Sequence, residues 1–329
     1  MGKTYGVGFI GVGAISELHQ LCIEEMENTE LRGITDVNQS LIERRVKEWG
    51  VPVYLDVESL LKADDIDVVY VLSPVEYHAE HAIQAMRAGK HVLCEKPVAM
   101  NPEQIKEMDR VSKETGKVCF PAHNYIYHPE VIKIKKYIDD GVFGKICSAW
   151  LSFCIHHDEE LASHYPGVNR QIMTHHLYTI LYLLGKPKKL GCMTANLHYE
   201  KLDREDQSVI MLEMEDGAQA VLFSSFACDD ETSNPFTYFV KVLGTQGGAN
   251  HSWSDISFNR AIGTLGKAYT KYEEVFLYEA KYFINECIEK GKQPLSTIAD
   301  AVIVQELVEL AEENAGKQIV TYTPAAYTS

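Results

Sequence analysis

The sequence lacks a long apolar run, a paired-cysteine motif and an excess of basic charge. No stretch of the 329 residues approaches the roughly 18 uninterrupted apolar residues that a membrane-spanning helix needs. The eight cysteines include no Cys-x-x-Cys pair, which is typical of a reduced compartment where free cysteines act as small buried hydrophobes. Basic residues number 31 against 47 acidic ones, and the formal net charge of −16 disfavours nucleic acid and anionic membranes as partners.

The sequence also lacks a signal-peptide pattern, internal repeats, low-complexity tracts and flexible linkers. Its first residues, MGKTYGVGFIG, start with glycine-rich turn chemistry instead of the basic and apolar regions of a signal peptide. We therefore expect a cytoplasmic protein. With 329 residues, 46% of them hydrophobic, the chain is long enough for two domains with a core each.

A glycine-rich turn joins the first predicted strand to the first predicted helix. Tyr5 to Ile10 is typical of a short buried strand, and Glu17 to Met26 is compatible with a helix. The turn between them fits G-x-G-x-x-G with Ser16 at the third glycine position, where a small residue lets helix and strand pack closely. Gly11 permits the turn, Gly13 lets a pyrophosphate approach the backbone, and the helix amino terminus offers free N–H groups. The turn residues expected to bind the cofactor are Gly11, Gly13, Ala14 and Ile15.

An acidic residue ends the second predicted strand, as the dinucleotide-binding fingerprint requires. Leu31 to Thr35 runs into Asp36, about 20 residues beyond the turn. A carboxylate at this position accepts hydrogen bonds from the ribose 2′-OH and repels a 2′-phosphate. Val37 stands where an NADP site often has an arginine. The pattern therefore predicts NAD as the cofactor.

Strands and helices then alternate through the first third of the chain. Apolar residues recur with a helical period from Ala79 to Met86, and Gly89 ends this helix. Such alternation predicts an α/β unit, a doubly wound parallel sheet of the Rossmann type with right-handed crossovers. The other elements expected are a helix from Gln39 to Trp49, a strand near Val53, a helix from Glu58 to Lys62, and strands from Ile66 to Leu72 and from His91 to Glu95.

The stretch HVLCEKP, residues 91–97, places a carboxylate and an ammonium group at the carboxyl end of a strand. Ligands of open parallel sheets bind at this end of the strands. Glu95 and Lys96 are therefore expected on the same rim as the glycine turn, Asp36 and Ser73. The alternative is a structural ion pair where the strand reaches solvent.

The pattern changes after Val118 to Phe120, and long alternating runs replace the strand–helix repeats. Two of these runs are joined by Glu215-Asp216-Gly217, which is a hairpin signal. The second half is therefore predicted to be α+β, with an open, largely antiparallel sheet. Its runs are Ile146 to Ile155, Leu190 to Leu197, Ser208 to Met214, Ala218 to Phe226 and Phe236 to Leu243.

Two late helices and a last strand are expected to close the chain. The helices are predicted from Glu273 to Lys290 and from Ile298 to Ala315, and the strand at residues 319–322. We expect a dinucleotide-binding domain over residues 1–121. Residues 122–329 are expected to form a domain for substrate binding and oligomerisation.

The most specific stretch of the first half is A-x-x-A-G-K-H-V-x-x-E-K-P. It occurs together with GFIGVGAIS, ITD, SPVEYHAEH and, later, IDDGVFGKI. In this combination, almost the whole chain resembles the Gfo/Idh/MocA family of NAD(P)-dependent oxidoreductases, named after glucose-fructose oxidoreductase and inositol dehydrogenase. The resemblance implies a second domain whose open sheet covers the cofactor with one face and contacts another subunit with the other.

The resemblance also assigns roles to residues on the rim. It implies that Lys96 reaches both the nicotinamide ribose and the substrate, that Glu95 contacts the cofactor region, and that Pro97 turns the chain away. Val75 departs from the family, which commonly has an asparagine there. The remaining residues that the resemblance places in the cofactor site are Ser73, Pro74 and His78.

The segment from Asn169 to Gly185 is predicted to be a helix that carries a candidate acid/base. By the resemblance, His175 matches the histidine of the family's D-x-G-x-H-x-x-D-L helix. Gln171 and Tyr178 are expected on the same face, and each stands where the family has an aspartate. Because a glutamine cannot share a proton, substrate recognition or the proton relay must differ from that of the inositol and sugar dehydrogenases. Some branches of the family use a tyrosine as the acid/base, so Tyr178 and the tyrosines of HNYIYHP are further candidates.

A cluster of histidines near residue 160 raises the question of a metal. His156, His157, Asp158 and His164 have a spacing that matches no pattern of metal ligands. Hydride transfer to NAD needs no metal, so none is predicted. We expect these residues to line a strand end and a loop near the substrate.

The sequence therefore predicts an NAD-dependent dehydrogenase or reductase that interconverts an alcohol and a ketone on a small polyhydroxylated substrate, a sugar or a cyclitol derivative. Two alternatives stay open. One is a non-catalytic NAD-binding regulatory protein, which Gln171 favours and which the family's galactose-pathway repressor relatives illustrate. The other is a glycosidase that uses NAD transiently. An uncovered apolar sheet face further predicts a homodimer or homotetramer joined through the C-terminal sheet.

Overall fold

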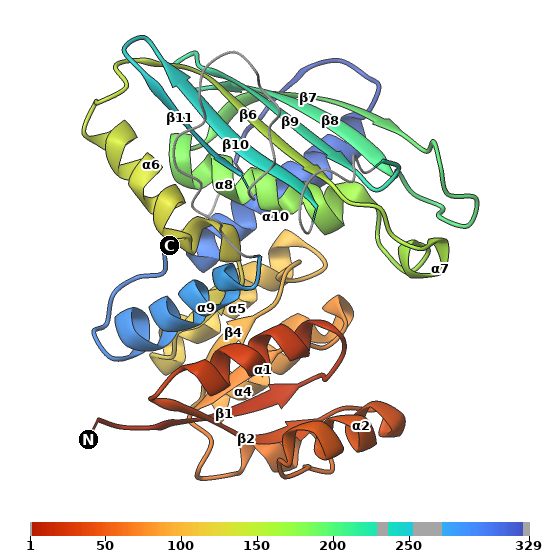
Figure 1. Cartoon of the computed structure of the whole chain (residues 1–329), viewed down its shortest axis with the longest axis vertical. Helices are drawn as coiled ribbons and strands as arrows, with labels where there is room; N and C mark the ends of the chain where they lie inside the picture. The colour runs from red at the N-terminus through yellow and green to blue at the C-terminus, as the bar shows by residue number, and fades with distance from the viewer. Residues whose placement is uncertain (1, 229–235, 253–271, 325–329) are drawn as a thin grey trace, which may run out of the picture. The chain divides into compact units, whose positions relative to one another are not determined.

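The computed structural model describes residues 2–228, 236–252 and 272–324 (Figure 1). The chain forms two compact units, each with its own sheet. The first comprises Met1–Tyr127 and Glu273–Val302, and the second His128–Tyr272 and Ile303–Ser329. A late segment thus belongs with the amino-terminal part of the chain. The division at residue 121 that the sequence suggests stays a prediction.

Five parallel strands form the sheet of the first unit: β1 (Tyr5–Ile10), β2 (Thr29–Thr35), β3 (Val68–Val71), β4 (His91–Cys94) and β5 (Cys119–Pro121). Their order in the sheet is β2-β1-β3-β4-β5, which confirms the predicted fold. All residues of β1 and β3 are buried, as expected for central strands of a sheet that is covered on both faces. The order reverses between β1 and β3, and ligands of such sheets bind beyond the carboxyl ends of the strands at this point.

The second helix of the first unit starts at a polar cap and ends at a glycine. At the start of α2 (Gln39–Trp49) the Asn38 side chain accepts hydrogen bonds from the N–H groups of Ser40 and Leu41, and Gly50 ends the helix with φ of 65°. These local signals explain why the helix boundaries follow the sequence pattern closely. The other elements are α1 (Ile15–Glu25), α3 (Val57–Leu61), α4 (His78–Arg87), α5 (Pro102–Thr115) and the 3₁₀ turns η1 (Val75–Tyr77) and η2 (Asn124–Tyr127).

The strand predicted near Val53 is wrong. The structure has only a single parallel bridge between Ile34 and Val53 at this place. Pro52 has no N–H to donate to a ladder, and Asp56 already caps the next helix, so no length remains for a strand.

The late segment of the first unit consists of α9 (Glu274–Lys281) and the π-helix η4 (Tyr282–Ile288). The sequence predicts one regular helix here, and the structure corrects this to a change from α to π winding. Phe283 of η4 is fully buried, and its ring centre lies 6.2 Å from that of Tyr70 in β3 and 4.9 Å from that of Phe120 in β5. The segment therefore completes the core of the first unit.

A seven-stranded sheet dominates the second unit. It is mixed but largely antiparallel, as predicted. The predicted hairpin turn is present, because Met214 donates to the carbonyl of Ala218 and Gly217 has φ of 88°. In sheet order the strands are β11 (Gly248–Ser252), β10 (Thr237–Gly244), β6 (Ile146–Cys154), β9 (Gln219–Ser225), β8 (Gln207–Met214), β7 (Pro187–Ala195) and β12 (Val320–Thr321), with β6 and β9 parallel.

One face of this sheet is covered by helix α8 (Thr174–Leu184) (Figure 1). Nε2 of His176 lies 3.0 Å from the carbonyl oxygen of Phe223 in β9, and the ring of Phe153 in β6 lies against the rings of His175 and His176. The remaining helices are α6 (Pro129–Asp139), α7 (Glu159–Ala162), the π-helix η3 (Asn169–Met173) and α10 (Ile298–Asn314), which spans both units. Across the described stretches, none of the helices has both the length and the apolar character needed to cross a bilayer.

The opposite face of the same sheet exposes large apolar side chains. Trp150 is 48% exposed, Met211 47% and Met193 64%, whereas their neighbours along each strand alternate toward the core. The strand register pairs Val221 with both Trp150 and Met211, so these side chains lie side by side. A contiguous apolar patch of this kind usually marks an interaction surface.

We predict that this face joins copies of the chain into a homodimer or homotetramer. Replacing Trp150 and Met211 together by Glu places two charges in the patch and should yield monomers, because a buried unpaired charge is costly. Multi-angle light scattering at micromolar concentration measures the mass. Leu55→Glu, at an exposed apolar residue of the first unit, is the matched control and should leave the mass unchanged. A monomeric wild-type protein would contradict the assignment.

Candidate cofactor site and acid/base pair

The glycine turn after β1 is held in a space that admits no side chain. Gly11 has φ of 95°, a conformation that L-residues rarely adopt. A Cβ there would lie 2.6 Å from the backbone nitrogen of Ser73 and from the backbone carbon of Leu72, just beyond β3. The N–H of Gly11 donates to the carbonyl of Thr35 at the end of β2 (2.9 Å). The turn is thus wedged among the carboxyl ends of three strands.

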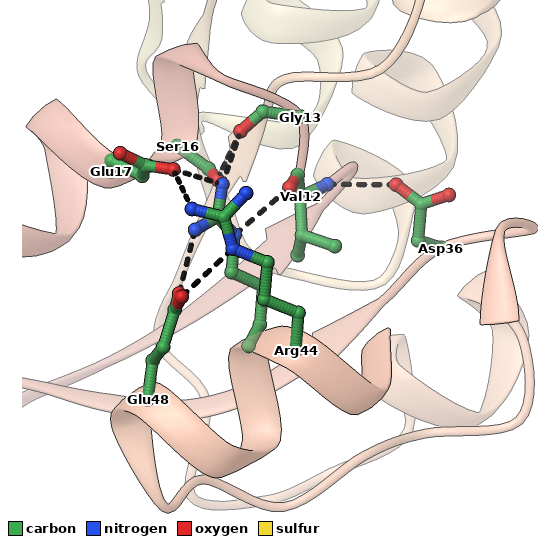
Figure 2. A network of polar contacts seen from close by, with 8 residues as sticks. Val12, Gly13, Ser16, Glu17, Asp36, Arg44 and Glu48 are labelled. Atoms are coloured by element: carbon green, nitrogen blue, oxygen red, sulfur yellow. Dashed lines mark hydrogen bonds and ion pairs between the residues drawn. The ribbon is translucent and has the colours of Figure 1, made fainter. Parts of the chain in front are cut away.

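The residues that lead into α1 offer unpaired backbone N–H groups. In the described part of the chain, the backbone N–H groups of Gly13, Ala14 and Ile15 donate to no protein acceptor, and no side chain caps the helix. A Cβ on Gly13 would meet nothing within 4 Å. Ser16 is fully buried, and its hydroxyl donates to the carbonyl of Gly13 (2.6 Å; Figure 2). Unpaired N–H groups, an open approach and a helix amino terminus fit a pyrophosphate.

Asp36 lies beside this turn, as the fingerprint predicts. Its Oδ2 accepts a hydrogen bond from the N–H of Val12 (2.8 Å; Figure 2), and its Oδ1 accepts one from the N–H of Asn38 (2.7 Å). Two backbone donors hold the carboxylate in one orientation while part of it stays exposed. Val37 is fully exposed and brings no cation to the site. This arrangement suits the two hydroxyls of a ribose and opposes a 2′-phosphate.

His78 ties together the chain segments that follow β3 and β4. Its Nε2 lies 2.6 Å from the carbonyl oxygen of Ser73, and its Nδ1 lies 2.8 Å from that of Pro97. Burial lowers the pKa of His78, while the two carbonyls raise it. The side chain is buried between these loops, so its geometry supports a structural contribution to the rim. Cofactor contacts from Ser73, Pro74 and His78 remain predictions.

Glu95 is buried at the end of β4 and is paired with a histidine that the sequence pattern did not single out. His19, on the buried face of α1, donates from Nε2 to Oε1 of Glu95 (2.9 Å). The N–H of Lys96 donates to Oε2 (2.8 Å). Burial raises the pKa of Glu95, but the hydrogen bond and charge of His19, together with Lys96, lower it below its usual value overall. Glu95 therefore stays ionised.

A second buried carboxyl group, that of Glu279 on α9, has a pKa shifted in the opposite direction. Neither of its oxygens has a hydrogen-bond partner among the described residues. Burial raises its pKa well above the usual value, and the negative charge of Glu95 raises it further. The two carboxyl groups are thus driven apart in pKa, with that of Glu95 below its usual value and that of Glu279 well above it. No sequence pattern pointed to Glu279, because glutamate on a helix is ordinarily exposed.

Lys96 follows Glu95 at the carboxyl end of β4 and is partly exposed. The Lys96–Pro97 peptide bond is cis. Burial lowers the pKa of Lys96, and the carboxylate of Glu95 acts in the opposite direction. The structure therefore places Lys96 at the carboxyl end of β4 and gives it an ionised neighbour.

The predicted acid/base pair lies in the second unit. Nδ1 of His175 is 2.7 Å from the hydroxyl oxygen of Tyr178, one turn later on α8, and both side chains are buried. Gln171 belongs to η3, so the continuous α-helix predicted for this segment is wrong: its first turn has π winding. π-turns occur often at functional sites. The structure brings His175 and Tyr178 together, whereas Lys96 belongs to the other unit.

The histidines near residue 160 contact neighbouring aromatic residues. His156 stacks on Tyr199 and meets His198 edge-on, while the backbone N–H of His157 donates to the hydroxyl of Tyr199. In residues 2–228, 236–252 and 272–324, no group of three or more His, Cys, Asp or Glu side chains is arranged to hold a metal. The tyrosines of HNYIYHP are buried in η2.

A five-stranded parallel sheet with a glycine turn, an acidic residue at the end of β2 and free N–H groups at a helix start defines a dinucleotide-binding protein. Comparison with family sequence models gives the particular family. The model of the oxidoreductase family with an NAD-binding Rossmann fold, Gfo/Idh/MocA, matches residues 5–123, and that of the Gfo/Idh/MocA C-terminal domain matches residues 131–250. The chain therefore belongs to the Gfo/Idh/MocA family, and its first unit carries the family's NAD-binding Rossmann fold.

Curated relatives match one part of the chain. A glycosyl hydrolase family 109 protein of Shewanella sp. (strain W3-18-1) is 35% identical over 152 residues. A Shewanella oneidensis protein named alpha-N-acetylgalactosaminidase is 34% identical over 152 residues. Each alignment covers 43% of this chain and 33% of the relative, so the chain spans about a third of the length of these relatives.

Solved structures share the fold over nearly the whole chain. A myo-inositol dehydrogenase from Corynebacterium glutamicum superposes with a TM-score of 0.83 at 18% identity, covering 98% of this chain and 100% of the other. The scyllo-inositol dehydrogenase from Lactobacillus casei, solved with NAD(H) and scyllo-inositol, gives a TM-score of 0.82 at 20% identity, covering 97% and 99%. At these identities the likeness shows the common fold.

Asp36 should make the protein prefer NAD to NADP by at least about tenfold in affinity, or roughly 1.4 kcal/mol. Asp36→Ala removes both the ribose acceptor and the repulsion of a 2′-phosphate, so it should reduce the ratio of NAD affinity to NADP affinity. Calorimetric titration with both cofactors measures this ratio. Glu43→Ala, on the exposed face of α2, should leave the ratio unchanged. Equal affinities in the wild type would remove Asp36 from this role.

The raised pKa of Glu279 should make stability fall as the solution becomes more basic. The pKa of Glu279 in the folded protein lies above its value in the unfolded chain. The stability that Glu279 contributes is therefore fully present below about pH 4.5 and is lost as pH rises through the folded pKa. Glu279→Gln should therefore gain stability relative to wild type as pH rises above about 4.5, by up to about 1.4 kcal/mol per pH unit, until pH passes the folded pKa. Urea midpoints report this, with Glu273→Gln as the exposed control. Parallel pH profiles for wild type and Glu279→Gln would be inconsistent with a buried proton.

Proposed function

We propose that the protein is an NAD-dependent dehydrogenase or reductase that interconverts an alcohol and a ketone on a small polyhydroxylated substrate. The observation that carries this proposal is the position of Lys96. It stands at the carboxyl end of β4, next to an ionised Glu95, in the unit that carries the NAD-binding turn. A cation at this end of the sheet suits a reaction in which an alcohol oxygen becomes negative.

Proton transfer is assigned to His175. In the oxidation direction, His175 takes the hydroxyl proton while the hydrogen on the same carbon leaves as hydride, and a C=O bond replaces the C–O single bond. The bound nicotinamide supplies the hydride acceptor. Lys96 lowers the free energy of the developing alkoxide through its charge, and His175 later releases the proton to solvent. Reduction follows the reverse course.

The contact between His175 and Tyr178 engages Nδ1 of the histidine ring. In the proposed mechanism Nδ1 donates to the oxygen of Tyr178, and Nε2 accepts the substrate proton. An aspartate, which the family has at this place, would stabilise the imidazolium by its charge, whereas a neutral phenol only orients it. The His175 of this chain is therefore expected to be a weaker base than one paired with aspartate, and Gln171 to position a hydroxyl without sharing its proton.

The names of dehydrogenases with a similar fold support one substrate class. The solved structures of like fold include dehydrogenases named for myo-inositol and scyllo-inositol. Their substrates carry secondary alcohols on every ring carbon, which a dehydrogenase oxidises one at a time. We propose a cyclitol or a sugar derivative as the substrate of this chain. We also propose that the cofactor contacts come from the glycine turn, Asp36 and the rim that ends at Lys96.

The second candidate function is that of a glycosidase which uses NAD transiently. It is favoured by the names of the curated relatives, glycosyl hydrolase family 109 protein and alpha-N-acetylgalactosaminidase. In such a reaction, the hydride removed from the sugar returns to it after the glycosidic bond is broken, so no NADH accumulates. The two functions are distinguished by incubating the protein with NAD and either free cyclitols and sugars or nitrophenyl glycosides. Steady NADH formation supports the dehydrogenase, and nitrophenol release without NADH supports the glycosidase.

A non-catalytic regulatory function is the third reading. Gln171 is the residue that favours it, because it cannot take part in proton sharing. Lys96 and the His175–Tyr178 pair oppose it, since a protein that only senses NAD has no need of a buried acid/base pair. Failure of both substrate panels to react, with NAD still bound, would support the regulatory function.

Lys96→Met should reduce folding stability and NAD affinity only modestly while turnover falls about a hundred- to a thousandfold, because a positioned charge on a developing oxyanion is lost. His175→Asn should reduce turnover by about a hundredfold or more and flatten the pH profile. In the proposed mechanism both groups act on one oxygen, so the double variant should lose less than the product of the two losses. NADH absorbance with a panel of sugars and cyclitols measures these rates.

An exposed lysine provides a control for Lys96→Met. Lys62→Met removes a surface lysine at the carboxyl end of α3 and should keep the wild-type rate. If Lys96→Met also kept it, Lys96 would be a cofactor contact or a strand-end ion pair.

A further inference from the structure

Arg45 of α2 is a buried cation that bridges the glycine turn to two carboxylates. The residue is 1% exposed. Its Nε donates to the carbonyl of Val12 (3.2 Å), and its Nη2 donates to the carbonyl of Gly13 (3.4 Å). Nη2 also lies 2.6 Å from Oε1 of Glu17 on α1, and Nη1 lies 2.7 Å from Oε2 of Glu48 on α2. Figure 2 shows both carboxylates, Glu17 and Glu48, beside the turn at Val12 and Gly13. One guanidinium group thus contacts the turn, the helix that follows it and its own helix.

The two carbonyls that Arg45 holds belong to the peptide groups that present the phosphate donors. A trans peptide group is planar, with its C=O and N–H pointing in opposite directions. The carbonyl of Val12 shares a plane with the N–H of Gly13, and the carbonyl of Gly13 shares a plane with the N–H of Ala14. Fixing the carbonyls on the Arg45 side therefore turns both N–H groups toward the opposite side, where they lack a protein acceptor.

We propose that Arg45 is a positioning residue for the cofactor pyrophosphate, which it serves by orienting the peptide groups on both sides of Gly13. The inference rests on the proposed NAD site. The planar guanidinium is suited to this task, since it donates in several directions from one rigid group. Its flat side also lies over the ring of Trp49, 4.9 Å from the ring centre, which restricts its rotation.

The charge of Arg45 does not by itself explain this arrangement. Glu17 and Glu48 pair with it directly and offset its charge, so its long-range attraction for a phosphate is small. Its neighbour Arg44 pairs with the same two carboxylates and is 58% exposed. Arg44 and Arg45 therefore share their ionic partners, and Arg45 differs by its hydrogen bonds to the turn. This makes Arg44 the matched control.

The test compares Arg45→Lys, Arg45→Met and Arg44→Met with the wild type by calorimetric titration of ADP-ribose, which carries the pyrophosphate, and of adenosine by competition. Lys keeps a cation for Glu17 and Glu48 but cannot span both carbonyls with a rigid fork. Urea unfolding at several temperatures identifies a temperature at which each variant is fully folded. The titrations are run at that temperature.

We expect both Arg45 variants to bind ADP-ribose about tenfold more weakly while adenosine affinity stays unchanged. Arg44→Met should bind both as the wild type does. A purely structural contribution would lower the urea midpoint of the Arg45 variants and leave the ADP-ribose affinity of the folded protein unchanged, which would overturn the inference. An equal loss in Arg44→Met would overturn it too, because the effect would then follow charge alone. A wild-type protein that binds no ADP-ribose would instead refute the proposed NAD site.

Discussion

The first unit depends on one steric constraint, the close approach of the chain after β1 to the chain after β3. With backbone atoms of Leu72 and Ser73 at 2.6 Å from the position that a Cβ on Gly11 would occupy, the residue after β1 can only be glycine. The tight turn there starts α1 at the rim of the sheet and leaves its first N–H groups unpaired. The same approach brings the ends of β2 and β3 beside the turn, so Asp36 contacts Val12. The cofactor half of the site follows from this packing.

Ionisable groups in the core of the first unit also influence the charge at the carboxyl end of β4. Glu95 is ionised because His19 and the N–H of Lys96 satisfy its oxygens. Glu279 has no hydrogen-bond partner among the described residues, and burial raises its pKa well above the usual value. The negative charge of Glu95 stands beside Lys96 and favours the charged form of Lys96 against the effect of burial. Buried groups of the first unit thus influence the charge of Lys96.

The sequence predicts what local pattern encodes. The glycine turn, Asp36 at the end of β2 and the placement of His175 and Tyr178 on one helix face follow from spacing and from the family motif, and the structure adds the contact between the two side chains. It could not predict His19 as the partner of Glu95, because the two are 76 residues apart and each alone is an ordinary residue on its element. The π winding of η3 could not be predicted from the sequence either, because side-chain periodicity over a single turn does not separate α from π winding.

The central claim is that the free N–H groups at the start of α1, Asp36 and Lys96 together bind NAD with its nicotinamide toward Lys96. A crystal structure with NAD bound tests it most directly. The account predicts the pyrophosphate against the N–H groups of Gly13 and Ala14, the adenosine ribose on the Asp36 carboxylate and the nicotinamide ribose near Lys96. A cofactor whose adenosine ribose lies away from Asp36, or whose nicotinamide lies away from Lys96, would contradict it.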